Sequence, residues 1–320
     1  MSLWLKMISV TVFAAYRRRY GSNGMKPPPL GYSRPESVAE ALQVLADLGP
    51  DGKVLAGGQS LIPLLSMRLA GSMHLVDINR LAELSYVRVA ENQVRVGALT
   101  RHAELLASAS AAEAQPLLAR ALRCVAHPAI RNRGTTVGSI VHADPAAEMP
   151  AVLALLGGTV RVASAGGERQ VPASEFFLGP LESAVQYGEL ATEVAFPALP
   201  PDAGTGFAEI SRRRGDYAVC GVAALARLGK DGQIASAQAA YLSVGPSPLV
   251  IELTQAVTGA SDQQAARAAA EQARAQVDPE GDIHATAGYR RHVAGVLTQR
   301  ALSQALAEAR QRQLTGMTPG

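Results

Sequence analysis

The sequence has little of what a metal centre needs. Only two of its 320 residues are cysteine, Cys124 and Cys220, and both lie in apolar runs. Two thiols are too few for a protein-borne iron–sulfur cluster or a cysteine-based zinc site. The six histidines are dispersed without the spacing of metal ligands. We therefore predict no metal site in this chain, and the scarcity of cysteine is typical of a reduced, cytoplasmic setting.

Aromatic residues and net charge are also scarce. Aromatics make up 4% of the chain, and the formal net charge is only +3. No basic stripe is interleaved with aromatic side chains, so nothing in the sequence indicates a nucleic-acid partner. Hydrophobic residues at 48% and charged residues at 18% are ordinary for a globular protein, and the length suffices for two or three packed units.

The apolar stretch over residues 3–16 is too short to span a bilayer, and it contains Lys6. The basic cluster at residues 17–19 follows this stretch, whereas a secretory signal carries its charge before the apolar core. We interpret residues 1–24 as an extension that is disordered or lies upstream of a natural start at Met25. A membrane-surface anchor is the alternative, and we predict no stable membrane insertion.

Beyond Met25 the pattern predicts an α+β fold. Ser33 and Glu36 resemble a capping box for a helix that ends at Gly49. Strands are expected at 53–56 and 74–78, and alternating runs at 86–89 and 93–96 predict a hairpin. After the proline-rich linker at 197–204, strands at 206–211, 218–228 and 234–244 predict an antiparallel sheet with helices over 253–276 and 287–312. The expected boundaries are 25–200, with subdomains at 25–80 and 81–200, and 206–315.

Two glycine-bearing turns carry the strongest functional signal. Each is preceded by a possible strand or extended run and offers unhindered amides beside hydroxyls, which suits a phosphate group. The two turns are Ala56-Gly57-Gly58-Gln59-Ser60 and Thr135-Thr136-Val137-Gly138-Ser139. Either turn alone is typical of plain chain reversal, but together they indicate a dinucleotide held from two sides. Neither has the spacing of a Rossmann fingerprint or a P-loop, so binding of a nicotinamide cofactor or ATP is disfavoured without being excluded.

The residues around these turns resemble a known family, the FAD-binding medium subunit of the molybdenum hydroxylases of the carbon monoxide dehydrogenase and xanthine dehydrogenase type. The resemblance covers residue 25 to the C-terminus. It rests on residues 56–64 and 130–150, on Glu175-Phe176-Phe177-Leu178-Gly179, on Gly188-Glu189-Leu190 and on the stretch 212–218. It implies a two-subdomain FAD-binding domain of the molybdopterin dehydrogenase type, followed by a C-terminal sheet domain with helices.

The resemblance also implies the site. The two turns would hold the pyrophosphate and ribityl regions, Glu148 would accept from ribityl or ribose hydroxyls, Thr100 is a weaker candidate, and Tyr217 would lie near the isoalloxazine. The expected cofactor-binding residues are Ala56, Gly57, Gly58, Gln59, Ser60, Leu61, Thr100, Thr135, Thr136, Val137, Gly138, Ser139, Glu148 and Tyr217. No catalytic residue and no metal ligand is expected in this chain.

The function that the resemblance implies is electron transfer. Substrate would be hydroxylated at a molybdopterin cofactor in a large subunit, and electrons would pass through two [2Fe–2S] clusters in a small subunit to FAD here and then to an external acceptor. The expected assembly is a dimer of heterotrimers, a heterohexamer. Two alternatives stay open, a stand-alone FAD oxidase or dehydrogenase and a flavin-free assembly subunit. The substrate and the acceptor are open as well.

One position departs from the family pattern. The family's second signature has two glycines, whereas this sequence has Val137 before Gly138. A β-branched residue resists positive φ, and its side chain would crowd an approaching phosphate or ribityl chain. We therefore expect Val137 either to lower FAD affinity or to give the loop a slightly different path, and Val137→Gly to tighten binding. The run Arg212-Arg213-Arg214 is expected to be a solvated charge run, with flavin tuning, acceptor steering or partner contact as alternatives.

Overall fold

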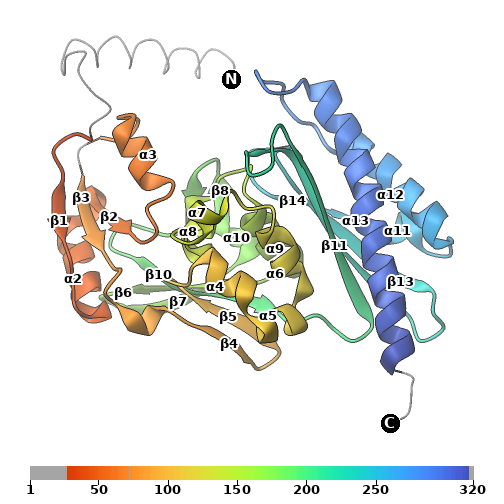
Figure 1. Ribbon diagram of the computed structural model, residues 1–320, viewed down its shortest axis with the longest axis horizontal. Helices are drawn as coiled ribbons and strands as arrows, with labels where there is room; N and C mark the ends of the chain where they lie inside the picture. Colours follow the sequence, from red (N-terminus) through yellow and green to blue (C-terminus); the bar gives the residue numbers. More distant parts are fainter. Residues whose placement is uncertain (1–26, 72, 317–320) are drawn as a thin grey trace.

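A three-stranded parallel sheet, ordered β1-β3-β2, begins the part of the chain that the structure describes, residues 27–71 and 73–316 of a computed structural model (Figure 1). The extension expected over residues 1–24 lies outside the described residues. The elements of this unit are β1 (Gly31–Ser33), α2 (Val38–Leu48), η1 (Gly49–Asp51), β2 (Gly52–Leu55), α3 (Leu61–Ser66) and β3 (His74–Asp77). The strand that runs into the first glycine turn is present as predicted, and α3 follows the turn.

The N-cap of the first helix lies four residues after the predicted one. Ser37, not Ser33, is the N-cap of α2 and accepts a hydrogen bond from the Glu40 amide at 3.1 Å. Ser33 instead belongs to β1, where its hydroxyl lies 2.7 Å from His74 Nε2. The predicted capping box was therefore wrong, because parallel pairing with β3 keeps Ser33 extended. The helix does end at Gly49, at φ +54°.

A five-stranded antiparallel sheet, ordered β4-β5-β10-β6-β7, forms the second unit. The predicted hairpin is present between β4 and β5, and both turn residues, Glu91 and Asn92, have positive φ, which matches the twist of the strands. Alternate side chains of the central strands are fully buried beneath helices, Val94 and Val194 among them.

The second unit contains η2 (Ala82–Leu84), β4 (Val87–Ala90), β5 (Gln93–Gly97), α4 (His102–Ala107), α5 (Ala109–Ala114), α6 (Pro116–Leu122), α7 (Pro128–Arg131), α8 (Thr136–His142), α9 (Glu148–Leu156), β6 (Thr159–Ser164), β7 (Gly167–Pro172), α10 (Ala173–Phe176), β8 (Phe177–Gly179), β9 (Glu182–Ser183) and β10 (Leu190–Pro197). Strands β8 and β9 pair as a small separate ribbon.

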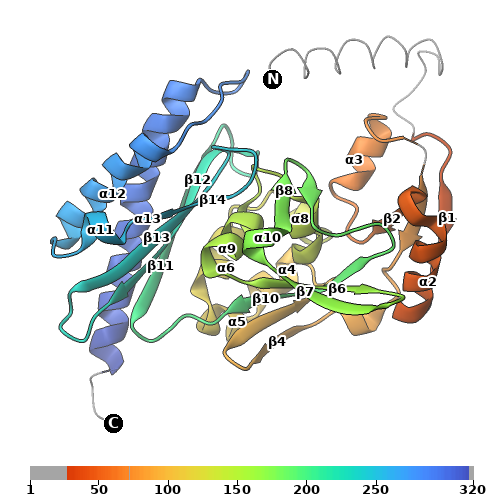
Figure 2. The ribbon, with the colours of Figure 1, turned by 180° about the vertical axis from the view of Figure 1, so that it is seen from behind.

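The third unit is a four-stranded antiparallel sheet, ordered β11-β12-β13-β14, that is covered on both faces (Figures 1 and 2). The predicted helices pack on one face, and α6 and α9 of the second unit pack on the other. Successive side chains of β12 point to opposite faces of the sheet. Val222 and Ala224 belong to the core beneath the C-terminal helices, whereas Ala223 belongs to the core of the second unit.

Its elements are β11 (Ala203–Ser211), β12 (Ala218–Leu228), β13 (Ile234–Leu242), β14 (Leu249–Glu252), α11 (Thr254–Val257), α12 (Asp262–Gln276) and α13 (Ala287–Gly316). Strand β14 was not predicted. The single helix expected over 253–276 is divided, because Gly259 has φ +75° and Ser261 begins a new helix with a capping box.

A half-buried ion pair joins the second unit to the third. Arg120 of α6 donates to both carboxylate oxygens of Glu308 on α13, at 2.7 and 2.9 Å. The same guanidinium donates to the Thr205 carbonyl, and the Thr205 amide donates to Glu308 at 2.7 Å. A bidentate arginine–carboxylate pair fixes the relative orientation of its two side chains as well as their distance. It therefore holds the C-terminal sheet in one position against α6. Among the described helices, none is both long and apolar enough to cross a bilayer.

Candidate functional site

The two glycine turns meet in space. A Cβ on Gly57 would lie 2.4 Å from the Arg133 carbonyl oxygen and 2.8 Å from the Gly134 Cα, so only glycine allows this approach. In Figure 1 the loop after β2 reaches across to α7 and α8. Segments far apart in the sequence thus form one continuous backbone surface, which we call the paired loops, residues 56–61 and 133–139.

A bridge of side chains holds the paired loops together. Arg101 donates to the Arg133 carbonyl at 2.5 Å and to Asn79 Oδ1 at 2.7 Å. Asn79 in turn donates from Nδ2 to the Ala56 carbonyl at 2.8 Å. Neither bridging residue was expected from the sequence. Arg101 and Asn79 bind backbone carbonyls of distant segments, and no local sequence pattern predicts such contacts.

Asp77 anchors this bridge from beneath. Its Oδ1 accepts from the Asn79 amide at 2.9 Å and from Asn79 Nδ2 at 2.6 Å, while Oδ2 accepts from the Tyr32 hydroxyl at 2.6 Å. Burial works to raise the pKa of Asp77, but the hydrogen bonds from Tyr32 and Asn79 outweigh it and hold that pKa below its ordinary value. The ionised carboxylate therefore fixes the Asn79 side chain in the orientation that reaches the first loop.

The first loop presents unused hydrogen-bond donors. Within the described residues, no acceptor lies in bonding position to the amides of Gly57, Gly58, Gln59 and Ser60. Gly58 has φ +71°, a conformation that other residues adopt only with strain. The Ser60 hydroxyl makes no cap bond to α3. Orphaned amides of this kind are normally satisfied by a ligand or by water, so this loop is arranged to receive an anion.

The second loop is the start of a helix. Thr135 is the N-cap of α8, and its hydroxyl accepts from the Gly138 amide at 3.1 Å. The Thr136 amide donates to the Thr100 carbonyl at 3.2 Å, whereas the Val137 amide has no acceptor among the described residues. The strand or extended run expected before this turn is absent, because the short helix α7 precedes it.

The structure removes both grounds for the expectation that Val137 lowers FAD affinity. Val137 lies in α8 and has no positive φ, so the predicted backbone conflict was wrong. Its side chain is 1% exposed and belongs to the hydrophobic core. A side chain enclosed in the core does not obstruct a ligand that approaches from solvent.

Buried polar residues on the protein side of the second loop hold it in place through hydrogen bonds. Thr100 is 1% exposed, and its hydroxyl donates to the Tyr86 carbonyl at 2.6 Å and accepts from the Tyr86 amide at 3.1 Å. His102 Nδ1 lies 3.1 Å from the Thr136 hydroxyl, and burial together with Arg131 lowers the pKa of His102 to about 4. Thr100 and the neutral His102 therefore position Thr136.

Glu148 is the first residue of α9, and its side chain is only 7% exposed. Burial, with a smaller contribution from the Glu209 carboxylate, raises the pKa of Glu148 to about 8. The preceding loop is shaped by Asp144, whose carboxylate accepts from the Ala146 amide at 2.8 Å. Tyr217 is 73% exposed, on the loop that carries the arginine run.

The arginine-bearing loop packs back onto the second unit. Gly215, at φ +89°, lies so close to His127 that a Cβ would meet the imidazole at 2.6 Å. His127 is the N-cap of α7, which leads into the second loop. Arg212, Arg213 and Arg214 are all exposed, so they add positive charge beside the site without side-chain partners in the described chain.

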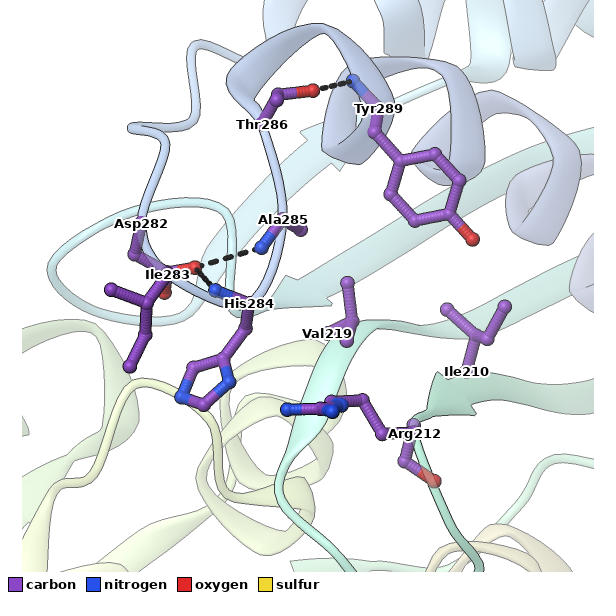
Figure 3. A pocket seen from close by; sticks show the side chains of 10 residues that line it. Ile210, Arg212, Val219, Asp282, Ile283, His284, Ala285, Thr286 and Tyr289 are labelled. Atoms are coloured by element: carbon purple, nitrogen blue, oxygen red, sulfur yellow. Dashed lines mark hydrogen bonds between the residues drawn. The ribbon is translucent and has the colours of Figure 1, made fainter.

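A separate hollow of about 540 Å³ opens between the end of β11 and the segment before α13 (Figure 3). Arg212 and His284 point toward one another across it, and Asp282 accepts from the amides of His284 and Ala285 at 2.8 and 3.0 Å. None of the residues expected to bind a cofactor lines this hollow. The paired loops, not the hollow, therefore remain the candidate site.

Comparison with known proteins agrees with this geometry. Residues 26–199 match the family described as the FAD binding domain in molybdopterin dehydrogenase, and residues 205–305 match the CO dehydrogenase flavoprotein C-terminal domain. The chain belongs to the FAD-binding medium subunits of the molybdenum hydroxylases. It is thus the flavoprotein subunit of an oxidoreductase.

Relatives match along nearly their whole length. The chain is 41% identical to the 6-hydroxypseudooxynicotine dehydrogenase complex subunit alpha of Paenarthrobacter nicotinovorans, covering 89% of this chain and 97% of the relative. It is 36% identical to the carbon monoxide dehydrogenase medium chain of Hydrogenophaga pseudoflava, covering 88% and 99%. The solved quinoline 2-oxidoreductase of Pseudomonas putida 86 superposes with a TM-score of 0.83 at 36% identity, covering 90% of this chain and 99% of that one.

The residues present fit the diphosphate of FAD. Four consecutive amides on one loop and the Val137 amide on the other lack acceptors, and a diphosphate supplies anionic oxygens on two sides. The Ser60 and Ser139 hydroxyls are without partners among the described residues and can donate as well. The family membership and the donor set of the paired loops therefore point to the same cofactor.

Proposed function

We propose that this chain holds FAD across the paired loops and passes electrons from [2Fe–2S] clusters of a small partner subunit to an external acceptor. The observation that carries the proposal is the meeting of Gly57 with Arg133 and Gly134, which places unsatisfied amides of both loops around one space. When bound, FAD supplies the redox chemistry, and the protein supplies binding, orientation and electrostatics.

The roles of the individual residues follow from their contacts. Amides of Gly57, Gly58, Gln59 and Ser60 would bind one side of the diphosphate, and the Val137 amide with the Ser139 hydroxyl would bind the other. Thr100, Thr135 and Thr136 hold the second loop in position through the bonds described above. Ala56 and Leu61 are the end residues of the first loop, and Gly138 leaves room for the Thr135 cap. Glu148 would accept from hydroxyl groups of the cofactor, and the exposed Tyr217 would lie beside the isoalloxazine.

The partners are proposed from the relatives. Several of them are named as the medium chain or medium subunit of their enzymes, among them carbon monoxide dehydrogenase and nicotine 6-hydroxylase. A medium chain implies a larger and a smaller one. We therefore propose a large subunit with the molybdopterin cofactor, a small subunit with two [2Fe–2S] clusters, and a dimer of such heterotrimers.

Substrate choice lies outside this chain in the proposal. Relatives at 41, 38 and 36% identity are named for 6-hydroxypseudooxynicotine, glyceraldehyde and carbon monoxide respectively. Comparable similarity to subunits of enzymes with such different substrates is what a shared electron-transfer module would give. The substrate would be selected in the large subunit.

Purification of the native complex tests the proposal. Its chains are counted by denaturing electrophoresis and native mass spectrometry, and its absorbance spectrum is recorded with FAD, iron and molybdenum extraction. We expect three kinds of chain, one FAD per copy of this chain, and iron–sulfur absorbance. A single chain that turns over substrate with its own FAD would support the stand-alone enzyme instead, and a flavin-free complex would support the assembly subunit.

A further inference from the structure

Arg290 is a buried arginine of α13, far along the chain from the paired loops. Its side chain is enclosed, and the guanidinium binds three groups. Nη1 donates to the Val219 carbonyl at 2.8 Å and to the Ser243 carbonyl at 2.9 Å, and Nη2 donates to Asp282 Oδ2 at 2.6 Å. One side chain therefore joins the last helix to two separate segments of the C-terminal sheet.

These two segments lie where strands β12 and β13 separate. The pairing of the two strands begins with Gly221 opposite Leu242, so Val219 precedes the paired part and Ser243 follows it. Past this point no ladder hydrogen bond joins the two strands, and the Arg290 guanidinium joins their carbonyls instead. A planar guanidinium holds its acceptors in a fixed geometry, so the two strand ends are fixed relative to each other.

Ser243 extends this contact to two parts of the proposed flavin site. Its hydroxyl donates to the carbonyl of Ala218, the residue after Tyr217, at 2.7 Å. Its amide donates to the Pro145 carbonyl at 2.8 Å, in the loop that leads into Glu148. Ser243 has φ +61°, a conformation that residues other than glycine keep only when surrounding contacts impose it. The hydrogen bond from α13 to its carbonyl is one of those contacts.

Asp282 orients the guanidinium. Its Oδ1 accepts from the amides of His284 and Ala285, as the dashed lines in Figure 3 mark, and its Oδ2 accepts from Arg290. The backbone hydrogen bonds fix the carboxylate, and the carboxylate in turn fixes the arginine.

Fold stability alone does not explain the arrangement. The Arg290 Nε is enclosed and has no hydrogen-bond partner among the described residues. Removing a guanidinium from water is costly, and an ion pair offsets that cost only when its remaining donors are satisfied. What the buried arginine does supply is a fixed geometry for the segments that it joins.

We propose that Arg290 is a positioning residue for the flavin site: through Ser243 and the start of β12, it sets where Tyr217 and the loop before Glu148 lie relative to FAD. The inference rests on the proposed function, in which Tyr217 lies beside the isoalloxazine and Glu148 accepts from hydroxyl groups of the cofactor. Arg290 does not touch the cofactor. The C-terminal domain thereby helps to place a cofactor whose diphosphate the N-terminal domain binds.

Limited proteolysis of the full chain tests the positioning without any flavin. Trypsin cleaves after arginine, and the three exposed arginines at 212–214 lie on the loop that Arg290 anchors. Arg290→Gln should raise the rate of cleavage in this loop about tenfold, because a hydrogen bond from a charged donor is lost. Mass spectrometry identifies the cleaved bonds. Arg291→Gln is the matched control and should be cleaved as the wild type is, since Arg291 pairs with the exposed Asp278.

The flavin potential of the purified complex tests the link to the cofactor. It is measured by redox titration for the wild type, Arg290→Gln, Tyr217→Leu and the double variant. We expect both single variants to shift the potential in the same direction, because each removes the tyrosine from its place beside the isoalloxazine. The double variant should shift it no further than Tyr217→Leu alone, since residues that act through one another are not additive. A merely structural Arg290 would leave the potential at its wild-type value.

The outcomes separate this inference from the proposed function. Equal cleavage rates for the wild type and Arg290→Gln would overturn the positioning role, whatever the flavin does. A potential that shifts in Tyr217→Leu but not in Arg290→Gln would also overturn it. A potential unchanged in Tyr217→Leu would instead overturn the proposed place of Tyr217, and the cleavage rates would still decide whether Arg290 positions the loop. If Arg290→Gln does not fold, Arg290→Lys replaces it, because lysine keeps the charge beside Asp282 but lacks the guanidinium fork.

Discussion

Gly57 and Arg133 touch through their backbones, although the sequence places them in separate units. A Cβ on Gly57 would lie 2.4 Å from the Arg133 carbonyl oxygen, and Arg101 donates to that same oxygen at 2.5 Å. One carbonyl therefore sets both how near the first loop approaches and how the second loop is held. The width of the space between the loops, and with it the fit of a diphosphate, depends on this contact.

Gly57→Ala should weaken flavin binding by separating the loops. The added methyl group has to displace backbone atoms, and overpacking of this kind costs about 1–3 kcal/mol, so we expect a loss in FAD affinity of roughly tenfold. Fluorescence titration measures the loss. Gly288→Ala is the control, because a Cβ there meets nothing within 4 Å. Equal affinities for the two variants would mean that the contact does not shape the site.

Arg101→Ala should have a comparable effect through the bridge. Hydrogen bonds from a charged donor contribute about 1.5–3 kcal/mol, and this change removes those to Asn79 and to the second loop, so FAD affinity should fall at least about tenfold. Arg101→Lys should restore little, since an ammonium group cannot span the two acceptors as the guanidinium fork does. Arg123→Ala, at an exposed position on the same unit, serves as the control and should bind FAD as the wild type does.

His102 should make the protein sensitive to acid. Its pKa is about 4 in the folded state, against an ordinary value of 6.5. Below about pH 6.5, His102 is therefore protonated in the unfolded chain but stays neutral in the folded one. Stability is therefore lost as pH falls from 6.5 toward 4, by about 2 kcal/mol at pH 5. Urea unfolding at about pH 7 and about pH 5 measures this loss. The His102→Gln variant should lose less unfolding free energy over the same pH range. An identical loss in both proteins would show that His102 is not the source of the acid sensitivity.

Val137→Gly should destabilise the fold without improving the site. It removes a core side chain from α8 and places glycine in a helix, which together cost about 2 kcal/mol in unfolding free energy. Flavin affinity should stay within about twofold of wild type, because residue 137 keeps the backbone amide that the second loop offers to the diphosphate. Calorimetry and flavin titration separate the two effects. A marked tightening of FAD binding would restore the crowding explanation that the structure has removed.

The sequence predicted those secondary-structure elements whose formation depends on neighbouring residues. The hairpin at Glu91 and Asn92, the strand before the first glycine turn and the C-terminal sheet were all expected. The helix cap was misplaced because Ser33 and Ser37 each precede a glutamate by three residues, and only pairing with a distant strand decides between them.

The parts of the site that escaped prediction depend on tertiary contacts. Arg101 and Asn79 act on carbonyls of segments far along the chain, and nothing in their own neighbourhoods marks them. Glu209 stands in a strand where a single glutamate is typical of a solvent-facing position. The structure leaves it only partly exposed and encloses its Oε2 atom, because α6 covers that face of β11. Val137 was misjudged for the same reason, since its burial depends on the packing of α8.

The structure of the purified complex with its cofactor tests the central claim most directly. Cryo-electron microscopy would locate FAD relative to the paired loops. We predict that the diphosphate lies within hydrogen-bonding distance of the amides of Gly57 to Ser60 on one side and of Val137 on the other. Density for the diphosphate anywhere else on the chain, or a complex that carries no flavin on this subunit, would contradict the account.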